Sequence, residues 1–187
     1  MLRLENALKS ISGTQMDTLI ADCERTLRGG RRIIVSGLGK NVPICEKFVG
    51  TMVSMGLDAA FLHTNSAVHG DMGIIRAGDL VIILSKSGET EESVYLTRLL
   101  QRRAGVNLQL LTFNDHSTLA DMIRKKLVIH LEHEGDLWNI LPNNSTTLNL
   151  IVLQTVAIEV ARRMEVDLER DFKPNHPGGA IGHKLYF

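Results

Sequence analysis

A hydroxyl-rich segment, SKSGETEE at residues 85–92, has the residue types that hold a phosphate group. It follows the apolar run LVIIL, which is typical of a strand buried on both faces, and it leads into a predicted helix. Ser85 and Ser87 supply hydroxyls, Gly88 lets the backbone approach a ligand, and the amide groups of the helix start attract an anion. Serines at such a junction also cap helices, so the segment alone fits a structural role equally well.

Two groups of carboxylates have the chemistry of general acids and bases. Glu89, Glu91 and Glu92 lie in the first turn of the predicted helix, where the positive end of the helix dipole also favours them. Glu132 and Glu134 follow the apolar run LVIHL and could equally be ordinary loop residues. A carboxylate that faces a bound phosphosugar could move a proton between two adjacent carbons.

A lysine, Lys40, and three histidines, His63, His69 and His176, lie in segments predicted to be irregular. Lys40 ends the motif SGLGK, where it could attract a phosphate or polarise a carbonyl, or remain a solvated surface residue. The motif lacks the third glycine and the distant acidic residue of a dinucleotide site, and the spacing of a P-loop, so it does not indicate a cofactor. His69 belongs to a run HGD that also suits a tight turn, and His63 and His69, six positions apart with no third ligand implied, do not predict a metal site.

A second hydroxyl-rich helix start occurs at NNSTTLN, residues 143–149. Ser145, Thr146 and Thr147 are good N-cap residues, and capping is the simplest role for any one of them. Two such helix starts at one edge of a sheet could hold both the phosphate and the sugar hydroxyls of a single ligand.

The elements that position these residues alternate between strand and helix, which predicts an α/β fold. We expect a five-stranded, mainly parallel sheet with helices on both faces, a doubly wound three-layer sandwich whose ligand binds beyond the carboxyl ends of the strands. The whole chain, 1–187, is predicted to be one domain, with N-terminal helices in 1–28 and a C-terminal tail in 173–187. The predicted strands are 32–37, 59–62, 80–85, 107–113 and 126–132.

Composition narrows the class of partner. Lys plus Arg and Asp plus Glu number 21 each, so the charge balance predicts neither a nucleic acid nor a membrane surface as a partner. Cys23 and Cys45 have no paired spacing, which favours a reduced, intracellular protein. The N-terminus mixes charges into its apolar positions, unlike a secretory signal, and we therefore expect a cytoplasmic protein.

The motifs SGLGK, HGDMG, SKSGETEE, NNSTT and HPGGAIG follow one another in an order that resembles the sugar isomerase (SIS) domain of arabinose 5-phosphate isomerases. The resemblance runs from about Arg31 to the end. It implies interconversion of D-ribulose 5-phosphate and D-arabinose 5-phosphate through an enediol, without a cofactor or metal, for Kdo in bacterial lipopolysaccharide or capsule. Many members carry CBS modules after the HPGGA segment, so this chain resembles a form with the SIS domain alone.

The resemblance also implies roles for particular residues. One glutamate of the implied catalytic set is the base, the lysine stabilises the oxyanion, and the histidine opens the sugar ring or moves protons between oxygens; we do not rank the two glutamates. The catalytic set is Lys40, Glu92, Glu134 and His176, and the substrate-binding set is Gly39, His69, Ser85, Ser87, Gly88, Thr90, Ser145 and Thr146.

His176 lies on the C-terminal tail, which family precedent places across a subunit boundary. The resemblance therefore implies a homotetramer, or at least a dimer, with active sites shared between subunits.

Three departures from the family pattern leave the substrate open. Lys86 stands where asparagine is usual, the segment HTNSAV lacks the usual proline and glutamate, and Trp138 is a large group expected near the sugar pocket. The alternatives are an isomerase of another phosphosugar, such as a hexulose 6-phosphate, and a phosphosugar-binding sensor or regulator without catalysis.

Overall fold

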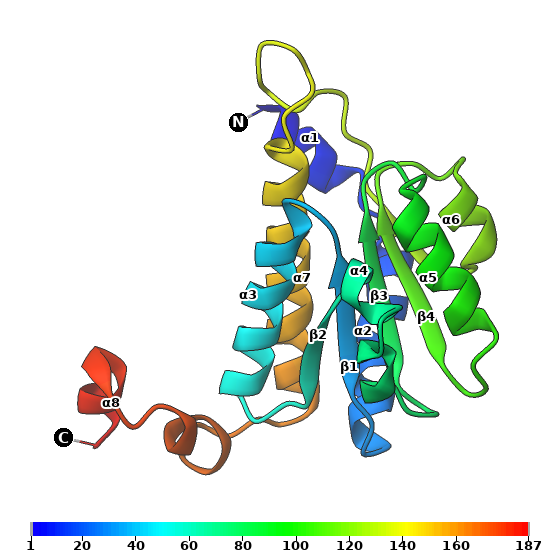
Figure 1. Cartoon of the computed structure of the whole chain (residues 1–187). Helices are drawn as coiled ribbons and strands as arrows, with labels where there is room; N and C mark the ends of the chain where they lie inside the picture. Colours follow the sequence, from blue (N-terminus) through cyan, green and yellow to red (C-terminus); the bar gives the residue numbers. More distant parts are fainter. Residues whose placement is uncertain (1, 187) are drawn as a thin grey trace.

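The computed structural model describes residues 2–186, so the two terminal residues of the predicted domain lie outside the described part. Its centre is a single sheet in the strand order β2-β1-β3-β4-β5, and every neighbouring pair is parallel (Figure 1). The predicted five-stranded α/β fold is confirmed, and the sheet is entirely parallel. The strands are β1 (Ile33–Gly37), β2 (Ala59–His63), β3 (Leu80–Ser85), β4 (Asn107–Thr112) and β5 (Lys126–Val128).

Burial on both faces of the sheet explains why the run at residues 80–84 of the central strand β3 is apolar. Leu80, Ile82 and Leu84 belong to one core cluster, whereas Val81 and Ile83 belong to the cluster on the opposite face. All five side chains are buried, because helices cover both faces of the sheet. The apolar run therefore has to be continuous rather than alternating.

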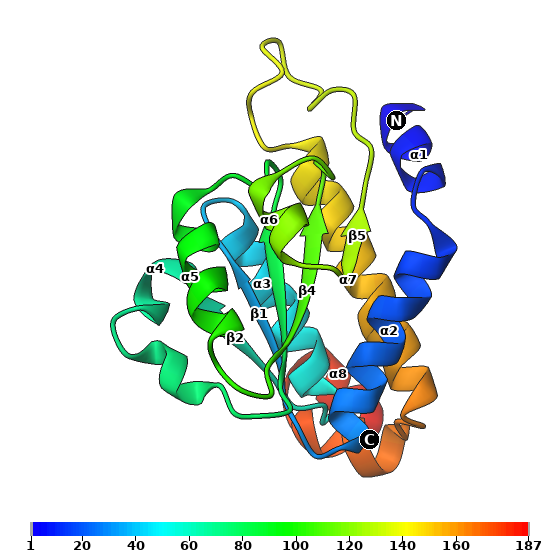
Figure 2. The same ribbon diagram turned by 90° about the vertical axis from the view of Figure 1, so that its right-hand side faces the viewer.

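The helices form one layer on each face of the sheet. Figure 2 shows α2 and α7 on one side and α5 on the other. The first layer packs through the larger core cluster and the second through the smaller one. The first layer contains α1 (Leu2–Lys9), α2 (Gly13–Arg28), α3 (Asn41–Ser54) and α7 (Asn144–Arg163); the second contains α4 (Thr64–Ala67), α5 (Glu91–Gln101) and α6 (Thr118–Met122). Among residues 2–186, no helix has both the length and the apolar character needed to cross a membrane.

Two boundaries differ from the prediction. The edge strand β5 ends at Val128 instead of residue 132. The amide of Ile129 donates to the carbonyl of Thr112, which is the last residue of β4, so no residue of β4 remains to pair with the segment beyond Ile129. The tail is not irregular throughout. It contains short helical turns over Leu168–Phe172 and Lys173–Asn175, and the helix α8 over Gly179–Tyr186, and it extends away from the sheet (Figure 1).

Candidate functional site

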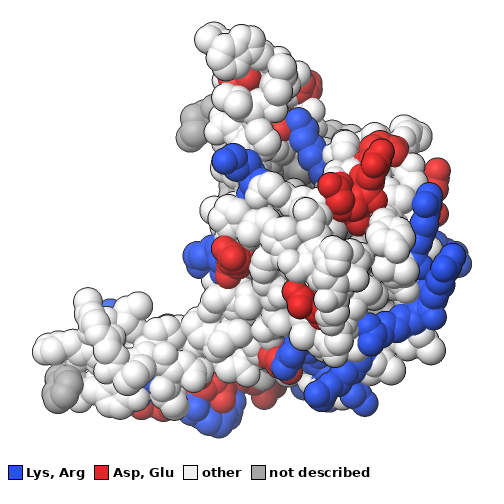
Figure 3. All heavy atoms as spheres, in the orientation of Figure 1, with Lys and Arg blue, Asp and Glu red and all other residues white. Residues whose placement is uncertain are grey.

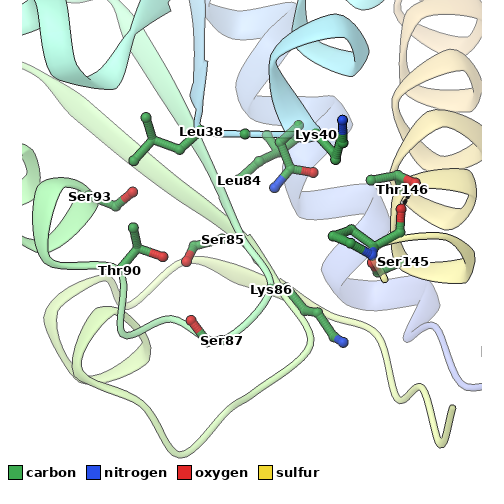
Figure 4. Close-up of a pocket in the computed structure, with 13 residues that line it drawn as sticks. Leu38, Lys40, Leu84, Ser85, Lys86, Ser87, Thr90, Ser93, Ser145 and Thr146 are labelled. Atoms are coloured by element: carbon green, nitrogen blue, oxygen red, sulfur yellow. Dashed lines mark hydrogen bonds between the residues drawn. The ribbon is translucent and has the colours of Figure 1, made fainter. Parts of the chain in front are cut away.

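An open cavity of about 330 Å³ lies at the carboxyl edge of the sheet, where the loops after β1 and β3 meet the start of α7 (Figure 4). Ligands of parallel α/β sheets bind at this edge, so the position agrees with the prediction. The cavity is lined by Leu38, Gly39, Lys40, Asn41, Leu84, Ser85, Lys86, Ser87, Thr90, Ser93, Pro142, Ser145 and Thr146.

The loop after β3 is shaped by its own hydroxyls. Gly88 has φ 69°, and its amide donates to Ser85 Oγ at 3.2 Å. The amide of Glu89 donates to Ser87 Oγ at 3.2 Å. Thr90 is the N-cap of α5 without a side-chain bond to the helix, and its hydroxyl lies beside that of Ser85 at the cavity (Figure 4). The loop thus presents hydroxyls next to a helix N-terminus, which suits an anion such as a phosphate.

A neighbouring helix fixes the back of this loop. The carbonyl of Gly88 accepts the amide of Leu119 at 3.0 Å. The carboxylate of Glu89 accepts the amide of Thr118 at 2.8 Å and its hydroxyl at 2.7 Å. These hydrogen bonds from Thr118 lower the pKa of Glu89. Glu89 therefore connects the loop to α6, and Gly88 shapes the loop without lining the cavity.

The loop after β1 brings a cation to the opposite side of the cavity. Gly39 has φ 57°, a conformation that glycine adopts without strain. Lys40, at the N-cap of α3, is exposed and lines the cavity. Next to it, Asn41 accepts the side-chain amide of Asn149 at 2.9 Å, which ties the start of α3 to α7.

Glu134 is completely buried under the same cavity. Its Oε2 accepts the amides of Asn143 at 3.0 Å and Ser145 at 2.9 Å, so it caps the start of α7. Its Oε1 lies 2.6 Å from Nζ of Lys86, which lines the cavity and is 44% exposed. Burial alone would raise the pKa of Glu134, but the contacts with Lys86, Ser145 and Asn143 outweigh burial and hold it below its ordinary value.

Glu92 and His69 do not line the cavity that contains Lys40. They line a neighbouring cavity of about 300 Å³ between α4 and α5, together with Thr64, Asn65, Val68 and Tyr95. In the space-filling view of Figure 3, acidic side chains gather over the start of α5, where Glu91 and Glu92 occupy the first turn. The predicted base Glu92 is therefore placed beside the loop after β3 and together with the predicted His69.

His176 lies far from the cavity of Lys40 within the chain. Its ring stacks on Phe172 with 3.8 Å between centroids, and its Nδ1 lies 2.9 Å from the carbonyl oxygen of Phe172. The tail follows the C-terminal end of α7, whereas Ser145 and Thr146 line the cavity at its N-terminal end. A helix of 20 residues is about 30 Å long, so the length of α7 separates His176 from the cavity.

The expected place of Trp138 near the sugar pocket is wrong. Its side chain is 66% exposed, and it does not line the cavity. Asp136 accepts the amides of Trp138 and Ile140, which folds the segment into a turn that projects at the top of Figure 1. Pro142 is the residue of this segment that reaches the cavity wall.

Sequence reasoning missed several residues of the wall. Ser93 lies three positions after Thr90, and this helical spacing could have placed both on one face. For Lys86 the sequence indicates only a departure from the family pattern, and nothing local connects it with Glu134. Among the described residues, no three His, Cys, Asp or Glu side chains gather into a metal site.

Comparisons with known proteins agree with this geometry. A family model described as the SIS domain matches residues 26–161. The arabinose 5-phosphate isomerase KdsD of Pseudomonas aeruginosa is 36% identical over 180 residues, which cover 96% of this chain and 55% of that protein. The chain spans about half the length of the curated relatives it matches.

Two solved structures share the whole fold. A Bacteroides fragilis protein assigned as a phosphosugar isomerase involved in capsule formation has a TM-score of 0.87 and 27% identity, covering 95% of this chain and 94% of that chain. A protein of Escherichia coli CFT073 in complex with arabinose 5-phosphate has a TM-score of 0.86 and 29% identity, covering 94% of this chain and 90% of that chain.

Proposed function

This chain belongs to the SIS domain family, and we propose on this premise that it is an aldose–ketose isomerase that interconverts D-ribulose 5-phosphate and D-arabinose 5-phosphate. The observation that carries the proposal is the cavity at the carboxyl edge of the sheet, in which Ser85, Ser87 and Thr90 line one side and Lys40 lies on the other. The names of the relatives and the arabinose 5-phosphate complex of the E. coli protein support the choice of substrate.

The hydroxyl loop acts on the part of the substrate that does not react. Binding of the phosphate by Ser85, Ser87, Thr90 and the start of α5 would hold the sugar in one orientation. The free energy of this contact is then available to align the first two carbons with the catalytic groups. Ser145 and Thr146, at the start of α7, are placed to contact the sugar hydroxyls.

The reaction moves one proton between carbons and one between oxygens. A carboxylate removes a proton from C1 of the ketose, and the electron pair forms the C1–C2 double bond of an enediolate while the carbonyl oxygen on C2 becomes the oxyanion. The same carboxylate returns the proton to C2, and the O1 proton passes to O2, which gives the aldose without a co-reactant. Lys40 stabilises the oxyanion, and Glu92 or Glu134 is the base.

We assign the remaining catalytic group, His176, to a second copy of the chain. Within one chain the length of α7, about 30 Å, separates this residue from the cavity. The tail that carries it extends away from the sheet and leaves Ile181 and Tyr186 about half exposed. These features support a homotetramer, or at least a dimer, with active sites shared between subunits.

The proposed pathway is the supply of arabinose 5-phosphate for Kdo in lipopolysaccharide or capsule. The P. aeruginosa relative and the capsule-related B. fragilis protein support this assignment. A phosphosugar substrate and two buried, reduced cysteines, Cys23 and Cys45, suit the cytoplasm.

The test is incubation of the purified protein with ribulose 5-phosphate and with a panel of other pentose and hexose phosphates, followed by detection of aldose formation. Turnover of ribulose 5-phosphate alone is the expected result. Turnover of a hexulose 6-phosphate instead would replace the substrate and keep the reaction class. Binding of these sugars without any turnover would refute the enzyme and favour a phosphosugar sensor.

Carboxylate catalysis is tested by Glu92→Gln and Glu134→Gln. Each variant should lose most of kcat and still bind the phosphosugar, because the hydroxyl contacts with the phosphate remain. Glu91→Gln is the matched control, since this residue is adjacent, exposed and equally charged, but lies outside the cavity of Glu92. Wild-type rates in both test variants would remove carboxylate catalysis from the mechanism.

A further inference from the structure

Lys86 occupies a position between two parts of the site. Its backbone belongs to the phosphate loop, with the carbonyl accepting the amide of Phe113 at 3.2 Å and the hydroxyl of Thr112 at 3.3 Å. Its side chain points away from Ser85 and Ser87, toward the start of α7 (Figure 4), where Nζ meets Glu134 Oε1 at 2.6 Å. The backbone is therefore fixed, while a long, half-exposed side chain retains room to turn.

We propose that Lys86 is a positioning residue whose side-chain ammonium leaves Glu134 and pairs with the phosphate of a bound phosphosugar. Binding of phosphate to the loop after β3 would then determine how readily Glu134 accepts a proton. The proposal rests on the proposed isomerase function and deepens it. It assigns a specific task to the lysine that stands where the family usually has asparagine.

The driving force is competition between two anions for one ammonium group. Glu134 offers Lys86 a single carboxylate oxygen, because its other oxygen is already engaged with the amides of Asn143 and Ser145. A sugar phosphate brings a charge of about −1.5 to −2 and three acceptor oxygens to a loop adjoining the lysine backbone. The side-chain ammonium of Lys86 is therefore expected to transfer to the phosphate.

The transfer changes what Glu134 can do. The carboxylate is 0% exposed in the free protein, and once Lys86 has left, its Oε1 loses the cation that stabilises its charge. A buried carboxylate in this state is a stronger base. In the free protein the ion pair keeps Glu134 weakly basic, and substrate binding makes it competent for proton abstraction.

The other charged groups around Glu134 do not duplicate this contact. Its neighbour His133 turns Nδ1 toward the amide of Gly135 at 2.9 Å and toward the guanidinium of Arg3 at 3.2 Å. Lys40 lines the same cavity but makes no ion pair with Glu134 in the described structure. Among residues 2–186, Lys86 is the charged side chain in direct contact with this carboxylate.

The first test is a titration of the Glu134 carboxyl by ¹³C NMR, with and without inorganic phosphate as the probe. In the wild-type protein phosphate should move the titration midpoint of Glu134 to higher pH. In Lys86→Met the midpoint should already be raised without phosphate, and phosphate should add little. Lys86→Arg keeps the positive charge and should retain the phosphate-dependent shift of the Glu134 midpoint. Lys40→Met should also retain this shift, although this variant should bind phosphate more weakly.

This measurement needs no turnover, so its outcome is separate from that of the enzyme assay. Failure of the wild-type protein to shift, or a full wild-type shift in Lys86→Met, overturns the proposal. A shift without turnover of any phosphosugar refutes the isomerase and leaves the exchange of Lys86 standing.

The second test uses the pH dependence of turnover. In a plot of rate against pH, the acidic limb of kcat/KM reports the pKa of the catalytic base in the free protein, and the acidic limb of kcat reports its pKa in the substrate complex. With Glu134 as the base, the kcat limb of the wild type should lie at higher pH than the kcat/KM limb, and in Lys86→Met the two limbs should coincide; a limb that Glu92→Gln removes and Glu134→Gln retains would show that Glu92 is the base. Coincident limbs in the wild type, or separated limbs in Lys86→Met, would contradict the exchange.

Discussion

The packing of Gly88 predicts a large and specific cost for a single methyl group. This residue has φ 69°, and a Cβ atom placed on it would overlap Ser117 Oγ and lie 2.6 Å from Ser117 Cβ. Ser117 cannot turn aside without loss, because its hydroxyl accepts the amide of Ala120 at 3.3 Å and donates to the carbonyl of Asn114 at 3.0 Å. Gly88→Ala must therefore displace either the phosphate loop or the start of α6.

Two contributions give the magnitude. The left-handed backbone conformation costs an alanine about 1–2 kcal/mol, and forcing a methyl group into a packed site costs about 1–3 kcal/mol more. We expect Gly88→Ala to lower the free energy of unfolding by about 2–5 kcal/mol. The matched control is Gly30→Ala, whose φ is 65° and whose added Cβ meets nothing within 4 Å, so it should lose only the backbone part.

Urea unfolding followed by circular dichroism measures both variants. With a slope of about 2 kcal/mol per molar urea, Gly88→Ala should lower the midpoint by about 1–2.5 M and Gly30→Ala by about 0.5–1 M. Gly88→Ala should also weaken binding of inorganic phosphate, because Ser85 and Ser87 move with the loop. Equal midpoints for the two variants would refute the packing argument.

Three further predictions concern charge and burial. The pKa of Glu134 is lowered from 4.5, so its contacts stabilise the folded wild type above pH 4.5, and this stabilisation is lost as the pH falls through the lowered pKa. Glu134→Gln should therefore lower the free energy of unfolding by about 1–3 kcal/mol at neutral pH, and plots of unfolding free energy against pH for the two proteins should converge in acid. Asp22→Asn should cost about 1.5–3 kcal/mol in urea unfolding, because this buried carboxylate pairs with two basic residues, whereas Glu5→Gln, in an exposed pair, should cost below about 0.5 kcal/mol. Burial raises the pKa of Cys23 and raises that of Cys45 to about 12, so neither thiol should react with Ellman's reagent until the protein unfolds.

The sheet was predictable because its signals are local and strong. Strands buried on both faces, such as β3, are continuous apolar runs, and each run is followed within a few residues by a turn or a helix start. The end of β5 was not predictable in the same way. Residues 129–132, Ile-His-Leu-Glu, keep the apolar–polar alternation of a strand, but β4 ends at Thr112 and offers no further partner for them. The length of an edge strand is set by its neighbour in space.

The candidate site shows the same division between local and distant information. The hydroxyl-lined loop after β3 could be predicted because its hydroxyls, glycine and helix start are contiguous. The partner of Glu134 could not, because Lys86 belongs to another loop and no periodicity relates the two. The distance of His176 from the cavity was also hidden, since it depends on the direction in which the chain leaves α7.

The acidic cluster at the start of α5 shows how helix geometry separates residues that the sequence presents as equivalent. Successive helical residues are rotated by about 100°. Glu89, just before the helix, is bound to Thr118, Glu91 faces the same side as Glu89, and Glu92 turns into the cavity that contains His69. Glu92 is therefore the carboxylate of this cluster that shares a cavity with His69, beside the loop that we propose holds the phosphate. The first turn of α5 follows that loop directly, so the segment that would bind the phosphate also fixes the position of Glu92, a proposed base.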